Sequence, residues 1–346
     1  MDRLVTLLLL GLLPGSALAL PPPTPRKSDA LVEQASRALE AGETEAAMRL
    51  LSQAQDADGR DPRPRFLRGS ALARTDPRGA EREYRAALAL EPTLAPVHAE
   101  LGALLLDGGN VAEACSELGA ATRFDPALAV GWQNLARCEA RLDHHAAALS
   151  AYARAEQLLP GDADVRIDHA MALRKAQRLE EAEKVARAAV AIDGRSAPAQ
   201  QALGFVLSSR GRLDDAVAAF TAASRLDPKS GAALWALGNA ERDRHHDEAA
   251  VAALTRAVAL DPRPPVAIDL AEVQSARGRH DEALATLAAA IARSPRSLGL
   301  QIARAKVQAA AGRCAEAHKT LAGLPRTAPV LAAEPVVTER CSRKRK

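Results

Sequence analysis

Apolar residues recur every three or four positions along most of the chain, which is the spacing of one face of an α-helix. Leu203, Val206 and Leu207 form one such stretch, and a second stretch that includes Phe220 comes after the break at Gly211. Two helical stretches with a short polar break between them predict two antiparallel helices joined by a tight turn.

The same pattern is copied every 34 residues. The proline column that keeps this step is Pro92, Pro126, Pro160, Pro228 and Pro262, interrupted by Gly194. Three more columns keep it: Ala80, Ala114, Ala148, Ala182, Ala216 and Ala250; Ala87, Ala121, Ala155, Ala189, Ala223 and Ala257; and the mainly large residues Tyr84, Leu118, Tyr152, Ala186, Phe220 and Leu254. A 34-residue unit repeated this often predicts a solenoid.

The columns have physical reasons. Proline lacks an amide hydrogen and restrains the residue before it, so the Asp227-Pro228 step ends the second helix of its unit. The two alanine columns lie seven residues apart with the large residue between them, which places all three on one helix face. Small side chains there allow a neighbouring helix to approach, and the large one fills the remaining space.

These columns resemble the tetratricopeptide repeat, whose unit is W-x-x-L-G-x-x-Y, then A-x-x-x-F, then A and P. The fullest copies are Leu203, Gly204, Leu207, Ala216, Phe220, Ala223, Pro228 and Trp132, Leu135, Ala148, Tyr152, Ala155, Pro160. The resemblance implies an all-α, right-handed superhelical solenoid of about nine helix-turn-helix repeats over residues 28–325. The units begin near residues 28, 61, 95, 129, 163, 197, 231, 264 and 298.

The fifth unit departs most from the pattern. His169 stands in its leucine column, Ala186 in its large-residue column and Gly194 in its proline column. We therefore expect this unit to pack least well. His169 is either a hydrogen-bonded core histidine or a ligand or switch.

Both ends of the chain lie outside the repeats. Residues 1–19 have the layout of a signal peptide, because a charged start precedes an apolar run of about ten residues and small residues end at Ala19. That run is shorter than the roughly 20 residues that span a bilayer, so we expect no transmembrane segment after cleavage. Residues 20–27 are a proline-rich spacer, and residues 326–346 are a basic, non-repetitive tail. The tail is expected to be mobile unless Cys341 is bonded to Cys314, and its cations either contact an anionic surface or only aid solubility.

Composition supports a helical core and excludes one class of partner. Apolar residues make up 48% of the chain but aromatic residues only 2%, so the core must be built from leucine, valine and alanine. The formal net charge is +3, of which the last eight residues contribute +4, so the repeats lack the basic excess of a nucleic-acid-binding protein. The abundance of arginine and alanine suggests GC-rich coding DNA and fits a bacterial source.

No phosphate-binding loop, nucleophile elbow or zinc-protease helix motif occurs in the sequence, so we expect no enzyme, no catalytic residue, no metal and no cofactor. The pairs His144-His145 and His245-His246 lie in predicted turns, where they either bind a metal loosely or are simply solvated.

Four cysteines form an even set, and neighbours in sequence suggest the pairs Cys115 with Cys138 and Cys314 with Cys341. The alternative is that some or all of them are buried free thiols.

Candidate binding residues lie on the predicted first helices of the units. By helical phase, Phe205 and Trp235 project away from the core of their units, toward the concave face that this family uses for peptides. The same face is predicted to carry Gln133, Asn134, Arg137, Arg141, Arg174, Lys175, Asn239 and Arg242. A cationic strip beside two aromatic rings suits an extended acidic or carboxylate-ended segment.

The sequence therefore predicts a non-catalytic scaffold that is exported, either periplasmic or secreted, and that binds a protein or peptide partner in its concave groove. Exported members of the family imply a role in the cell envelope or secretion pathway, by analogy. Two alternatives remain: a structural component that self-associates end to end, and an accessory subunit of an envelope or polysaccharide-export enzyme complex.

Overall fold

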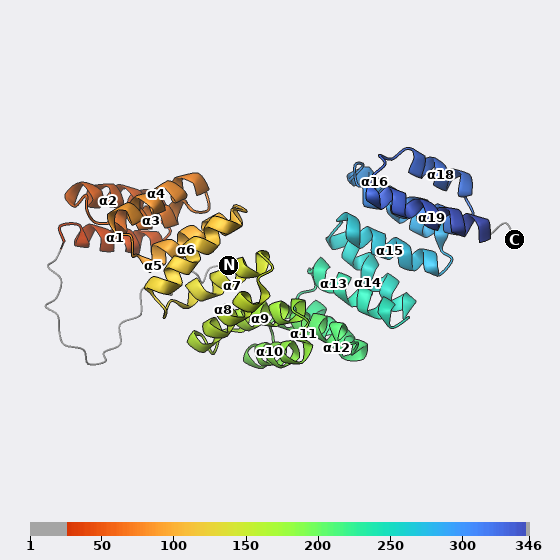
Figure 1. Cartoon of the computed structure of the whole chain (residues 1–346), viewed down its shortest axis with the longest axis horizontal. Helices are drawn as coiled ribbons and strands as arrows, with labels where there is room; N and C mark the ends of the chain where they lie inside the picture. The colour runs from red at the N-terminus through yellow and green to blue at the C-terminus, as the bar shows by residue number, and fades with distance from the viewer. Residues whose placement is uncertain (1–25, 344–346) are drawn as a thin grey trace. The chain divides into compact units, whose positions relative to one another are not determined.

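The computed structural model describes residues 26–343, and the regular elements in that range are helices, without any strand (Figure 1). The order runs from α1 to α19. The all-α repeat fold expected from the sequence is confirmed. The predicted signal peptide, residues 1–19, and residues 20–25 of the spacer lie outside the described range.

Helices α1 to α18 pair as nine hairpins, in which each odd-numbered helix packs against the even-numbered helix that comes after it. The hairpins are α1 (Asp29–Glu40) with α2 (Thr44–Ala57), α3 (Arg63–Leu72) with α4 (Pro77–Leu90), α5 (Ala95–Asp107) with α6 (Val111–Phe124), α7 (Ala129–Arg141) with α8 (His145–Leu158), α9 (Ala163–Lys175) with α10 (Leu179–Ile192), α11 (Ala197–Ser209) with α12 (Leu213–Leu226), α13 (Gly231–Asp243) with α14 (Asp247–Leu260), α15 (Pro264–Ala276) with α16 (His280–Arg293), and α17 (Leu298–Ala310) with α18 (Cys314–Ala322).

The hairpin of α11 and α12 shows how the sequence builds one repeat. Helix α11 begins where the Ser196 hydroxyl accepts a hydrogen bond from the Ala199 amide at 3.2 Å. The chain turns at Gly211, whose φ of 72° lies in the left-handed region that glycine adopts without steric cost. The turns of three other hairpins place Asp143, Gln177 and His245 at a positive φ instead.

Both alanine columns of the repeat are buried throughout, as their predicted place on the packing face requires. The large residue between them packs against the first helix of its own hairpin. A Cβ atom added at Gly204 of α11 would lie 2.6 Å from the ring of Phe220 in α12. Glycine at this position lets the ring lie directly on the backbone of α11, which explains the pairing of a small and a large residue in the repeat.

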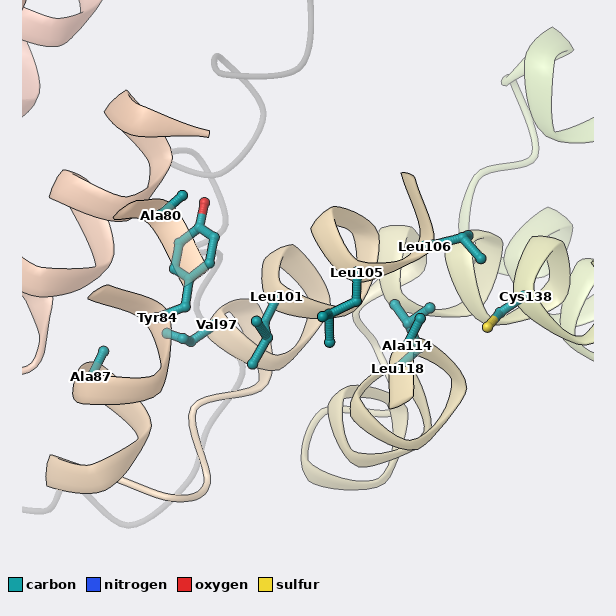
Figure 2. Packing of buried hydrophobic residues seen from close by; sticks show 10 residues of the cluster. All are labelled: Ala80, Tyr84, Ala87, Val97, Leu101, Leu105, Leu106, Ala114, Leu118 and Cys138. Atoms are coloured by element: carbon teal, nitrogen blue, oxygen red, sulfur yellow. The ribbon is translucent and has the colours of Figure 1, made fainter. Parts of the chain in front are cut away.

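The chain divides into two compact units, residues 1–160 and 161–346. In the first unit, Tyr84 of α4, Leu101 of α5, Leu118 of α6 and Cys138 of α7 belong to one buried cluster. Figure 2 shows these side chains succeeding one another from α4 through α5 to α6 and α7. Each helix therefore contributes to the core shared with its neighbours, as in other repeat proteins.

The second unit begins with the divergent fifth repeat, α9 and α10, in which both His169 and Ala186 are buried. This repeat also buries a charge, because the Glu183 side chain is only 2% exposed. Its carboxylate pairs with Arg187 of its own helix and with Arg210 and Arg212 in the turn of the next repeat.

Ion pairing decides the protonation state of that buried acid. Burial raises the pKa of the Glu183 carboxyl, but the hydrogen bond from Arg210 and the charges of Arg187 and Arg212 outweigh burial and hold this pKa below its ordinary value of 4.5. Glu183 is therefore ionised at neutral pH and joins the fifth repeat to the sixth.

The sequence analysis gave no helix in the tail after residue 325, but most of the described tail is helical. Residues Ala328–Arg343 form helix α19, which packs against α17 and α18. Val330, Ala333, Val337 and Cys341 are its buried side chains, and their spacing of three or four residues is that of one helix face. The proline inside the segment, Pro335, hid this pattern, because proline normally argues against a helix.

Candidate functional site

The candidate residues are divided between the two units. In the first unit, Gln133 and Asn134 of α7 are half-buried, whereas Arg137 and Arg141 are exposed. A guanidinium nitrogen of Arg141 donates a hydrogen bond to the carbonyl oxygen of Leu106, at the end of α5, at 2.5 Å. Arg141 thus forms a hydrogen bond within the protein, whereas the exposed Arg137 side chain faces solvent.

In the second unit, the first helix of each repeat contacts the first helix of the next, from α9 through α11, α13, α15 and α17 to α19. We call the surface formed by these helices the first-helix face. It carries the remaining six predicted residues, Arg174, Lys175, Phe205, Trp235, Asn239 and Arg242.

Arg174 of α9 and Phe205 of α11 lie together on this face. The guanidinium carbon of Arg174 is 5.6 Å from the centre of the Phe205 ring, a cation–π contact. Phe205 in turn meets the core ring of Phe220 edge-on, with ring centres 5.1 Å apart. The Nε atom of Arg174 is buried without a hydrogen-bond partner, so a donor at this point is unsatisfied.

Trp235, Asn239 and Arg242 of α13 converge on one carboxylate, that of Asp269 in α15. The indole Nε1 of Trp235 donates to Asp269 Oδ2 at 2.5 Å, and Asn239 Nδ2 donates to the same oxygen at 3.1 Å. A guanidinium nitrogen of Arg242 lies 3.7 Å from Asp269 Oδ1. The expected cationic strip is therefore partly neutralised from within, by an acid that the next repeat contributes.

A pocket of about 410 Å³ lies beyond this cluster, between α15, α17 and α19. Its lining residues are Glu272, Ser275, Ala276, Ala303, Lys306, Val307, Ala310, Val336 and Arg340. A guanidinium nitrogen of Arg340 donates to the carbonyl oxygen of Lys306 at 3.4 Å. The lining combines small and apolar side chains with charged groups of both signs.

Sequence reasoning missed Glu272 and Lys306, although the repeat contained a signal for them. Phe205, Asn239, Glu272 and Lys306 succeed one another at steps of 34, 33 and 34 residues. Counting along the repeat while allowing for one deleted residue would have placed all four on the same face. Arg340 continues the same step, 34 residues after Lys306, but its place on this face was missed because α19 was not expected.

The cysteines are joined in the structure as two disulfides. Cys115 of α6 is bonded to Cys138 of α7, and Cys314 of α18 is bonded to Cys341 of α19. Each bridge connects a second helix to the helix that comes after it, one bridge in each unit. Neither bridge includes a candidate groove residue, so both act through the helices that they join.

The turn histidines pair with carboxylates of their own repeats. Nδ1 of His144 lies 2.8 Å from Glu139, and Nδ1 of His246 lies 3.3 Å from Glu241. Within residues 26–343, no three His, Cys, Asp or Glu side chains are grouped so that they could hold a metal ion. Over the same range, the helices are all too short or too polar to cross a bilayer.

Comparison with protein-family models places two matches on the second unit. Models described as tetratricopeptide repeat match residues 202–265 and 274–333. The chain is a tetratricopeptide-repeat protein. The resemblance drawn from the repeat columns is thereby confirmed, and the matched ranges include Phe205, Trp235 and the α17 residues of the pocket.

Solved structures of other tetratricopeptide-repeat proteins share this fold. A chain of the APC/C hetero-tetramer Cut9–Hcn1 aligns with 82% of this protein, with a TM-score of 0.57 and 19% sequence identity. The alignment spans 56% of the Cut9–Hcn1 chain, little more than half of its length. A tetratricopeptide repeat protein from Parabacteroides merdae gives a TM-score of 0.55 at 14% identity, over 81% of this protein and 98% of its own chain.

PilF of Pseudomonas aeruginosa gives a TM-score of 0.53 at 22% identity, over 59% of this protein and 93% of its own chain. No curated protein matches this tetratricopeptide-repeat protein in sequence. At these identities the likeness concerns the fold. The tetratricopeptide fold supports a general role as a scaffold for protein–protein interaction.

Proposed function

We propose that this protein is a non-catalytic adaptor of the cell envelope or secretion pathway, and that its first-helix face in the second unit holds an extended segment of a partner protein. First helices line the concave surface on which the family binds peptides. Within that surface we choose the second unit, because its side chains include unpaired polar atoms and line a pocket.

Two buried polar atoms without partners carry the proposal. Nε of Arg174 is a hydrogen-bond donor and Oδ1 of Asn239 is an acceptor, and both are buried without a hydrogen bond on the same face. Buried polar groups in proteins are nearly always satisfied, so each of these atoms favours a ligand that satisfies it. A polypeptide segment supplies both groups, since a carboxylate can accept from Arg174 and a backbone amide can donate to Asn239.

The pocket indicates a second requirement on the bound segment. Its lining includes the apolar residues Ala303, Val307 and Ala310 and the charged residues Glu272, Lys306 and Arg340. The pocket of about 410 Å³ has room for an aliphatic side chain against these apolar residues. The proposed ligand is thus an extended segment with an acidic residue for Arg174 and an aliphatic residue for the pocket.

Export is supported by two independent features. Residues 1–19 have the layout of a signal peptide, and two disulfides are typical of proteins that fold in an oxidising compartment. Cell fractionation with mass spectrometry of the purified protein tests this point. We expect a mature chain that begins at Leu20 and contains no free thiol, whereas a cytosolic protein that retains Met1 would contradict export.

The binding proposal is tested by site-specific photocrosslinking in the native envelope. A photoreactive residue at Ser208 of α11, one helical turn after Phe205, should capture the partner. The matched control carries the same group at Arg225, an exposed position of α12. Capture at both positions alike would argue against a defined groove, and recovery of this chain alone would favour self-assembly.

Charge reversal then tests the chemistry of the groove. Arg174→Glu should weaken partner binding by about 10- to 100-fold, because it removes a charge-assisted hydrogen bond and adds a repulsive carboxylate. Arg225→Glu makes the same charge change on an exposed second-helix position and should leave binding unchanged. Arg137→Glu, in the first unit, shows whether that unit also takes part. Equal binding by all three variants would refute an acidic ligand on this face.

A further inference from the structure

Helix α19 closes the pocket on the first-helix face. It lies against α17 and α18, and it supplies Val336 and Arg340 to the pocket wall. The other walls come from α15 and α17, which belong to regular repeats. The pocket in its present form therefore exists only while α19 is docked.

The noncovalent attachment of α19 is narrow. Its buried side chains are Val330, Ala333, Val337 and Cys341, which are small or medium in size. Pro335 interrupts its hydrogen-bond ladder, since proline offers no amide to the carbonyl group one turn earlier. A single helix of 16 residues is marginally stable by itself in water.

A covalent bond compensates for this narrow contact. The disulfide between Cys314 and Cys341 ties the last turn of α19 to the first residue of α18, and it is the bridge nearest the pocket-lining residue Arg340. A bridge of this kind stabilises the docked state by restricting the chain when the helix is released.

We propose that the Cys314–Cys341 disulfide is a thiol-sensitive latch that controls the pocket. The inference rests on the proposed function, because it concerns regulation of the same face. A dithiol reductant supplies two electrons and two protons: the bond between the two sulfurs breaks, both cysteines become thiols, and the reductant becomes a disulfide. Release of α19 then removes Val336 and Arg340 from the pocket and uncovers the apolar side chains of α17.

Hydrogen–deuterium exchange of the full chain, with and without dithiothreitol, tests the latch. The Cys115→Ser/Cys138→Ser variant is used, so that reduction acts on the second bridge alone. Amides between Val330 and Cys341 should exchange on the order of 100-fold faster after reduction, since a disulfide of this span contributes about that factor to stability. Amides of α9 to α12 should not change, which provides an internal control.

A chemical probe reports on the pocket itself. Lys306, half-buried at the pocket, should react faster with an N-hydroxysuccinimide acetate ester after reduction, as measured by peptide mass spectrometry. The Cys314→Ser/Cys341→Ser variant should show fast exchange in α19 and fast Lys306 acetylation with or without dithiothreitol. Circular dichroism shows whether its remaining helices fold.

The outcomes are distinct from those for the binding proposal, because neither measurement needs a partner. If α19 stays equally protected in the reduced and oxidised protein, or if Lys306 reactivity does not change together with the exchange of α19, the latch is refuted. Loss of protection throughout the second unit would also refute it, since the bridge would then stabilise the whole unit rather than one helix.

Discussion

The buried carboxylate of Glu183 makes the strongest single prediction about stability. Its side chain is 2% exposed and contacts the guanidinium groups of Arg187, Arg210 and Arg212. A guanidinium nitrogen of Arg212 lies 2.5 Å from Glu183 Oε1. Replacing it by glutamine keeps the shape of the side chain but removes the charge. The fifth repeat would then lose its ionic connection to the sixth.

The size of the effect depends on what the three arginines can do afterwards. Removing one partner of a buried ion pair costs about 3–5 kcal/mol when the other partner stays buried. Here the Arg210, Arg212 and Arg187 side chains are 28%, 41% and 54% exposed, so they regain hydration when the carboxylate is lost. We therefore expect Glu183→Gln to lower the free energy of unfolding by about 2–3 kcal/mol, below the range for a fully buried pair.

Urea denaturation, monitored by far-ultraviolet circular dichroism, measures the loss. Solenoids unfold as coupled repeats, so hydrogen exchange in α9 to α12 should locate the effect near Glu183. The control is Glu180→Gln, which makes the same change at a side chain that is 81% exposed and pairs with Arg210 at 3.3 Å. An exposed pair of this kind contributes about 0–1 kcal/mol.

The pH dependence adds a second test with a defined sign. The pKa of Glu183 is lower in the folded protein than its ordinary value of 4.5, so its contribution is present above that value. The contribution is lost as pH falls below 4.5 and through the folded pKa. The stability gap between wild type and Glu183→Gln should therefore narrow in acid. A gap that is constant from neutral pH into acid, or a glutamine variant as stable as wild type at neutral pH, would refute the ionic account.

Three further changes probe the repeat. His245→Gly should raise the free energy of unfolding by about 0.5–1 kcal/mol, because His245 has a φ of 63° that glycine adopts without steric cost. Thermal melts measure the change, and a lower melting temperature would contradict this expectation. Gly204→Ala should destabilise the protein by about 1–3 kcal/mol in urea, since the new methyl group would meet the Phe220 ring; an unchanged midpoint would mean that the ring moves aside. Cys115→Ser/Cys138→Ser should cost about 3 kcal/mol under oxidising conditions and nothing in excess reductant, which the same urea titration distinguishes.

The hairpins were predictable because their signals are local and repeated. The break at Gly211 and the end at Asp227-Pro228 depend on backbone preferences of the residues themselves, and copies of the unit reinforced each inference. Helix α19 was missed, although Lys306 and Arg340 keep the 34-residue step of the repeat. Its apolar face was present in the sequence but stood beside Pro335, and its helical state depends on packing against α17 and α18.

The candidate site was predictable only in part. Helical phase brought Trp235, Asn239 and Arg242 to one face, but it said nothing about the carboxylate that they share. Asp269 lies 34 residues after Trp235 and reaches it only because α13 and α15 pack side by side. The positive charge of Arg242 in one repeat is thus partly neutralised by the carboxylate of Asp269 in the next repeat.

The sequence by itself determined the class of structure, the length of the repeat and the approximate residue at which each of the nine hairpins begins. These features depend on helical periodicity, glycine and proline, whose effects act within a few residues. Only the tertiary structure decided which charges are paired, where α19 docks and which side chains line the pocket. Those outcomes depend on contacts between helices about 30 residues apart in sequence, where the distance between two side chains is set by packing rather than by the order of residues along the chain.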